Sequence, residues 1–77
     1  MAGKPLSWED RAKRYLKAEL KRADIGYREL ADRLKKHGLE ESEASIANKL
    51  SRGTFPATFM LAALVAIGAE MVKLEDI

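Results

Sequence analysis

Residues 40–53, EESEASIANKLSRG, contain the short helix that decides how this chain folds. Ser42 stands where a helix N-cap is expected, and Arg52 and Gly53 have the form of a helix end. The spacing between them predicts one helix at residues 42–52, whose packing side we expect to be formed by Ala44, Ile46, Ala47 and Leu50. The polar residues of this segment then lie on its outer side, where another molecule can reach them.

A longer amphipathic helix is predicted before it, from about residue 8 to Ala23. Ser7 opens this helix, and Asp10 follows three residues later, which has the form of a capping box. Its basic residues occupy one face. The opposite, apolar face is predicted to consist of Trp8, Ala12, Tyr15, Leu16, Leu20 and Ala23.

A second helix is predicted to begin at Tyr27 and to end at the sequence KKHG. Its inner face is expected to carry Tyr27, Leu30, Ala31 and Leu34. Gly38 can adopt the left-handed conformation that ends a helix, and His37 is interpreted as a partner of the last carbonyl groups. The residues LEE then link this helix to the one at residues 42–52.

A fourth helix is predicted after Thr54, which can cap it, with Pro56 in its first turn. From Phe59 to Ile67 it is apolar nearly all round, and Gly68 ends it. The tail that follows is expected to form a turn or a short fifth helix. The sequence thus predicts an all-α, compact four- to five-helix orthogonal bundle: a flexible arm at residues 1–6 and one domain at residues 7–77.

The composition excludes several kinds of site. The 77 residues include no cysteine and one histidine, so disulfides, thiolate metal sites and multi-histidine metal sites are excluded. No glycine-rich phosphate loop and no defensible catalytic triad is present. We therefore expect a protein that is not an enzyme and that carries no cofactor and no metal.

The longest uncharged apolar run, FMLAALVAIGA at residues 59–69, is too short to cross a membrane, which takes about 20 residues. No signal peptide is recognised at the start of the chain. We expect a cytoplasmic protein without a membrane segment.

The net charge of +2 is unevenly distributed along the chain. Residues 4–22 carry seven basic and three acidic side chains, whereas residues 24–43 carry four basic and six acidic ones. The positive field therefore belongs to the first helix, which is compatible with a polyanionic partner.

The order of these elements resembles that of phage-repressor-like regulators, the lambda-repressor or XRE class of helix-turn-helix proteins. IGYRELADRL at residues 25–34 resembles the start of the class's helix-turn-helix, SIANKLSRG at residues 45–53 resembles its recognition helix, and LVAIGAEMVKLEDI at residues 64–77 resembles its closing pattern. The chain departs from the class in the longer link KKHGLEE, in the four-residue spacing of Ile46 and Leu50, and in Tyr27, where a glutamine is common. The chain also resembles short bacterial proteins catalogued as a domain of unknown function, which read RAK.YLK.EL and then SI.NKLSRG.F.

The repressor resemblance implies a small transcriptional regulator that reads the major groove of double-stranded DNA with the helix at residues 42–52. The outward residues expected to contact bases are Glu43, Ser45, Asn48, Lys49 and Arg52. The residues expected to contact the DNA backbone are Tyr27, Arg28, Arg14, Lys17 and Lys21. Each of these side chains also has an ordinary surface interpretation, such as an ion pair within one helix or a cap on helix-end carbonyls.

Glu40, Glu41 and Glu43 crowd the start of the helix that would meet DNA. They either stabilise the helix dipole or weaken DNA binding, and the sequence leaves both open. A monomer is expected to bind DNA weakly, so a homodimer is predicted, with Phe59, Leu64, Ile67 and Met71 at its interface. The alternative is a helical protein–protein interaction module that does not bind DNA.

Overall fold

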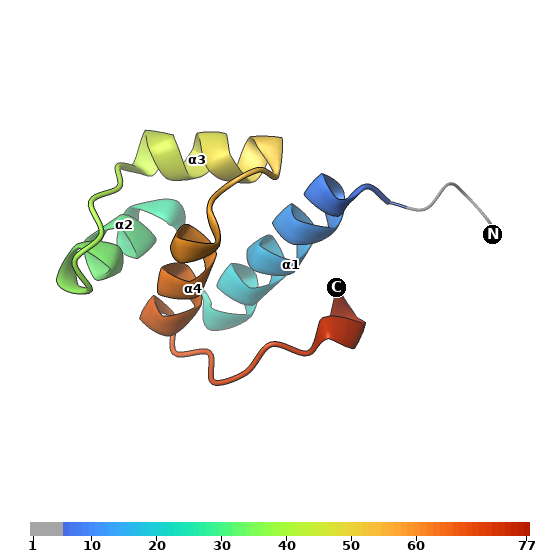
Figure 1. Ribbon diagram of the computed structural model, residues 1–77. Coiled ribbons are helices and arrows are strands. Elements are labelled where there is room, and N and C mark those ends of the chain that lie inside the picture. The colour runs from blue at the N-terminus through green and yellow to red at the C-terminus, as the bar shows by residue number, and fades with distance from the viewer. Residues whose placement is uncertain (1–5) are drawn as a thin grey trace.

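The computed structural model describes residues 6–77 and confirms the all-α fold (Figure 1). The helices are α1 (Trp8–Ala23), α2 (Tyr27–Lys36), α3 (Glu43–Arg52) and α4 (Ala57–Ala66), followed by one turn of 3-10 helix, η1 (Leu74–Asp76). Residues 6–77 include no β-strand. Apart from Leu6, the arm predicted for residues 1–6 lies outside the described residues.

The four helices pack crosswise. α3 packs against α1 and α2, and α4 packs against the same two helices. Figure 1 shows α3 along one edge of the molecule, while the segment after α4 runs along the opposite side of α1. One long side of α3 and the C-terminal segment therefore face in different directions, and a site on one is separate from a site on the other.

The core takes apolar side chains from every helix. Leu16, Leu30, Leu34, Ile46 and Leu50 are fully buried, as the helical spacing of the sequence predicts. Phe59, Ala63 and Leu64 close the core from α4. Because burial contributes roughly 25 cal/mol per Å² of apolar surface, these contacts are what hold such a short chain together.

The predicted helix ends are largely confirmed. The Ser7 hydroxyl accepts a hydrogen bond from the Asp10 N–H at 3.1 Å, and Ser42 caps α3 in the same way. Gly38 adopts a φ of 85° after α2, as predicted. The end of α1 is different, because Asp24 rather than a glycine takes the left-handed conformation there, with a φ of 59°. Aspartate tolerates the left-handed conformation better than most other residues with a side chain. The turn that it forms is followed by Ile25, which is buried in the core.

Three residues predicted to pack are instead exposed: Trp8, Ala23 and Ala44. Trp8 is 70% exposed, and the Arg11 guanidinium lies 4.1 Å from the centre of its ring. The helical spacing fixes the direction of a side chain around the axis, but not whether a neighbouring helix reaches that turn. The buried residues of α1 begin only at Tyr15, so the first turn lies beyond the core.

The start of α4 also differs from the prediction. Pro56 is the N-cap residue, and no side chain caps this helix. The Thr54 hydroxyl instead accepts a hydrogen bond from Arg52 Nε at 3.3 Å. Proline is suited to this place because it has no N–H to leave unsatisfied.

Candidate nucleic-acid interface

The candidate interface is the outer face of α3, together with the start of α2. Ile46 and Leu50 fix the inner face of α3 in the core, as Leu30 and Leu34 do for α2. The link at residues 37–42 connects the two helices: Gly38 turns the chain, Leu39 is half-buried, and Ser42 caps α3. The link is therefore longer than LEE and shorter than KKHGLEE, because Lys35 and Lys36 belong to α2.

Four exposed residues of α3 share one side of the helix: Ala44, Asn48, Ser51 and Arg52. Glu43 is also exposed, at the first position of the helix, but it precedes the buried Ile46 by three residues and so lies on the packing side. Asn48 lies opposite the two buried residues of α3, because it follows Ile46 by two positions and precedes Leu50 by two. Of the five predicted base contacts, Asn48 and Arg52 thus lie on the outer side, and Glu43 is exposed at the start of the helix.

The other two predicted base contacts, Ser45 and Lys49, are engaged inside the protein. The Ser45 hydroxyl donates to Glu41 Oε1 at 2.6 Å, and Lys49 Nζ donates to the same oxygen at 3.1 Å. Ser45 also completes a capping box, since its hydroxyl accepts from the Ser42 N–H at 3.0 Å. Both side chains are half-buried at the flank of α3, and their polar atoms already pair with Glu41.

Arg52 lies at the C-terminal end of the exposed side, and Lys13 of α1 reaches the same end. Lys13 Nζ donates to the Ser51 carbonyl oxygen at 3.3 Å and lies 3.6 Å from Asp10 Oδ1. Sequence reasoning missed Lys13, since nothing in a helical pattern says which flank of α1 meets α3. Gly53 marks the same junction, where its backbone closely approaches that of Glu9.

The residues predicted to contact the DNA backbone are mostly accessible. Arg28 is exposed in the first turn of α2, whereas Tyr27 is half-buried against the core. Arg14, Lys17 and Lys21 are exposed on α1, and within residues 6–77 none of them forms an ion pair. Lys17 follows Lys13 by one helical turn, so it lies on the side of α1 that meets the end of α3.

The charge of the candidate interface is mixed. Glu41 pairs with Lys49, so Arg52 is the cation left on the outer side of α3, while the exposed acids Glu40 and Glu43 lie at the opposite end of the helix. Any net attraction to a polyanion must therefore come from Arg28 and from the lysines of α1.

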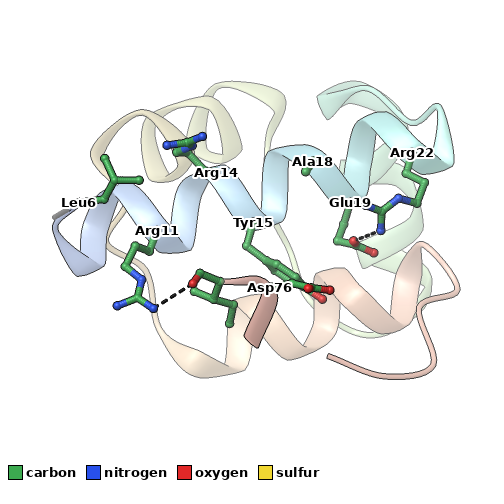
Figure 2. Close-up of a pocket in the computed structure, with 9 residues that line it drawn as sticks. Leu6, Arg11, Arg14, Tyr15, Ala18, Glu19, Arg22 and Asp76 are labelled. Atoms are coloured by element: carbon green, nitrogen blue, oxygen red, sulfur yellow. Dashed lines mark hydrogen bonds and ion pairs between the residues drawn. The ribbon is translucent and has the colours of Figure 1, made fainter. Parts of the chain in front are cut away.

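A separate groove of about 760 Å³ lies between α1 and the C-terminal segment (Figure 2). Three arginines and two acids line it. Arg11 Nη2 donates a hydrogen bond of 2.8 Å to the Ile77 carbonyl oxygen, which is the dashed line that starts at Arg11 in Figure 2. Burial raises the pKa of Tyr15 in its wall, and the charges of Glu19 and Asp76 raise it further. The groove is open, and Glu19 forms an ion pair with Arg22 there.

The residues predicted for a dimer interface are divided between core and surface. Phe59 and Leu64 are buried in the core of the single chain, so they cannot line a contact with a second copy. Ile67 is half-buried, and Met71 is exposed. The large exposed side chains of α4 are instead Leu61 and Val65.

Residues 6–77 contain no helix that is long and apolar enough to cross a membrane. No group of three histidine or acidic side chains in the same range is placed to hold a metal ion.

Comparison with known proteins identifies a family. No curated protein and no solved structure matches the chain. A family model described as "Domain of unknown function (DUF6471)" matches residues 8–72, a range that contains all four α-helices. This agrees with the second resemblance found in the sequence, and the chain belongs to the family of the domain of unknown function DUF6471.

Proposed function

We propose that this protein binds duplex DNA as a helix-turn-helix module, with the outer side of α3 in the major groove. The observation that carries the proposal is the exposure of Ala44, Asn48, Ser51 and Arg52 on one side of α3, while Ile46 and Leu50 lock the other side into the core. A helix held in this way can enter a groove without any change in the rest of the fold. The order of motifs shared with repressor-like regulators supports the same function.

The proposed contacts follow from exposure. Asn48, at the centre of the exposed side, can pair with an adenine edge, and Glu43 can accept from the amino group of cytosine. Arg52 can reach a guanine or a phosphate. Arg28 lies where it can hold the backbone, and Lys17 and Lys21 add attraction that does not depend on sequence.

A single copy is expected to bind weakly, because affinity depends on how many phosphates are neutralised and α3 contributes little positive charge. Two copies on two half-sites would double the contacts. The proposed contact between copies is the side of α4 that carries Leu61 and Val65, because α4 contains no charged residue and can meet itself without repulsion.

The test of DNA binding is a backbone NMR titration of the protein with a mixed-sequence duplex, at low and at physiological salt. Shifts confined to residues 27–28 and 43–52 that weaken as salt rises are the expected result. If no residue shifts even at low salt, the proposal is wrong.

The test of base reading is the variant Asn48→Ala, with Ser51→Ala as its control, because both residues are exposed on α3. Once a preferred sequence is known, Asn48→Ala should lower affinity for it by about tenfold or more, since a bidentate base contact contributes about 1–3 kcal/mol. Ser51→Ala should leave affinity unchanged. Equal effects of the two variants would contradict a reading role for Asn48.

A protein–protein interaction module is the second candidate function. It is favoured by the exposed apolar side chains Leu61, Val65, Met71 and Leu74, which DNA binding by a monomer does not use. A protein that shows no shifts with DNA, but whose α4 signals broaden with increasing protein concentration, would have this function.

A further inference from the structure

Glu41 is the one side chain of the link at residues 37–42 that joins the link to the middle of α3. Its Oε1 atom accepts hydrogen bonds from the Ser45 hydroxyl at 2.6 Å and from Lys49 Nζ at 3.1 Å. Ser45 lies in the first turn of α3, and Lys49 lies one turn later. A single carboxylate oxygen therefore holds two successive turns of the helix.

The pair of Glu41 and Lys49 is largely shielded from water, unlike the other ion pairs of residues 6–77. The Glu41 side chain is 11% exposed and that of Lys49 is 21% exposed. Lys49 Nζ also lies 5.5 Å from the centre of the Phe59 ring, so α4 contributes to the same cluster. Glu40, the preceding residue, is exposed and makes no hydrogen bond or ion pair within residues 6–77.

The link needs such an anchor because it is long. Its first half is held by backbone bonds, since the Leu39 N–H donates to the Leu34 carbonyl oxygen at 3.0 Å. Its second half is held by the Ser42 cap, which fixes where α3 begins. The buried side chains of Ile46 and Leu50 set how the helix is rotated toward the core. The contacts of Glu41 with Ser45 and Lys49, and the approach of Lys49 Nζ to the Phe59 ring, tie the link to the first two turns of α3 and to α4.

We propose that Glu41 is the positioning residue of the link: it fastens the link to the first two turns of α3 and holds Lys49 as a structural cation that is withheld from DNA. The first half of this inference is independent of function. The second half rests on the proposed DNA binding, and it makes an acid at the entrance of the proposed reading helix the group that keeps one cation of that helix from the duplex.

Removing one member of a shielded pair leaves the other charge without a partner, whereas removing both does not. This predicts a non-additive double-mutant cycle between Glu41→Ala and Lys49→Met, because methionine keeps the apolar stem that lies against Phe59. Glu41→Ala alone should lower the unfolding midpoint, and the double variant should recover part of the loss. Glu40→Ala is the matched control, because it removes the same charge one residue earlier and should leave the midpoint unchanged.

Amide hydrogen exchange separates a positioning role from a general loss of stability. Glu41→Ala should speed exchange of the Ser45 and Ile46 amides by roughly tenfold more than that of the Leu30 and Leu34 amides, since only the start of α3 loses its anchor. Glu41→Gln should restore part of this protection, because its amide oxygen can still accept from Ser45. Equal exchange in the Glu41→Ala and Glu40→Ala variants, or an additive cycle, would overturn the proposal.

The salt dependence of duplex binding tests the second half. In the otherwise unchanged protein, Lys49→Met should leave the slope of log affinity against log salt concentration unaltered, because Lys49 is already paired with Glu41. Glu41→Gln should steepen that slope by about 0.9, the value for one added phosphate contact, and Lys49→Met in that background should remove the gain. If Lys49→Met alone flattens the slope by about 0.9, Lys49 is a DNA contact and the second half is wrong. Should the protein bind no duplex at all, the proposed function is wrong, and the exchange experiment still decides the first half.

Discussion

Gly53 is the residue at which two structural demands coincide. It ends α3 with a φ of 75°, and a Cβ atom placed on it would lie 2.3 Å from the Glu9 carbonyl oxygen. The sequence shows the need for a left-handed conformation, because Gly53 stands at a helix end. The close approach to Glu9 arises only because the end of α3 meets the start of α1.

We expect Gly53→Ala to destabilise the protein by more than the roughly 1–2 kcal/mol that a left-handed conformation costs a residue with a Cβ, because the Glu9 backbone must also move. Gly38→Ala is the control, since it has a φ of 85° but nothing within 4 Å of its Cβ position. Chemical denaturation of both variants measures the difference. Equal losses of stability would show that the contact with Glu9 costs nothing.

The raised pKa of Tyr15 predicts how the stability of the protein changes at alkaline pH. Burial, Glu19 and Asp76 raise the pKa of its phenol above the ordinary value in the folded state. The folded state then binds the phenolic proton more tightly than the unfolded state does. The stability that Tyr15 contributes in this way is therefore complete below about pH 10 and is lost as pH rises through the pKa of the folded state. Tyr15→Phe should remove this part of the decline. Unfolding midpoints of both proteins, measured from about pH 8 to 11, give the comparison, and parallel curves would contradict it.

At the scale of the element, α4 shows how an apolar helix divides between core and surface. Its composition alone could not say which side was covered, and the residues predicted for a dimer interface included two that the core itself uses. Leu61 and Leu64 form a matched pair, because they are the same residue type on one helix with opposite exposure.

Leu64→Ala should destabilise the fold by about 2–5 kcal/mol, as large-to-small changes in a core do. Leu61→Ala, at a side chain that is 63% exposed, should change stability by about 0.5 kcal/mol or less. Thermal unfolding of the two variants measures both values.

The proposed contact between copies adds a second expectation for α4. Leu61→Glu should weaken self-association in sedimentation experiments, whereas Ala44→Glu, also at an exposed helical position, should not. A protein that stays monomeric at all concentrations would exclude this contact.

At the scale of the whole molecule, the positive charge is concentrated on α1 rather than on α3, the helix proposed to read DNA. Replacing Lys17 and Lys21 together by Gln should weaken binding to all duplexes by a similar factor and flatten its salt dependence by up to about 1 for each phosphate that is no longer neutralised. Replacing the exposed Lys35 and Lys36 at the far end of α2 is the matched control. Fluorescence anisotropy over a range of salt concentrations measures the slopes, and equal effects of the two pairs would mean that net charge alone matters.

The sequence by itself determined where the helices are. The caps at Ser7 and Ser42, the end of α2 at Gly38 and the inner faces carrying Leu30, Leu34, Ile46 and Leu50 depend on contacts within a few residues, which a sequence pattern records directly. Exposure of Asn48 followed from the same spacing.

Only the tertiary structure decided which of the polar residues are free. Lys49 and Ser45 have the outward pattern of contact residues, but the link folds back and places Glu41 beside them. Trp8 has the inward pattern of a core residue, but it is 70% exposed and its ring lies against the Arg11 guanidinium instead. In each case the period of the helix fixes the direction in which a side chain points. Whether that side chain is covered or paired depends on another part of the chain, which only the tertiary structure places beside it.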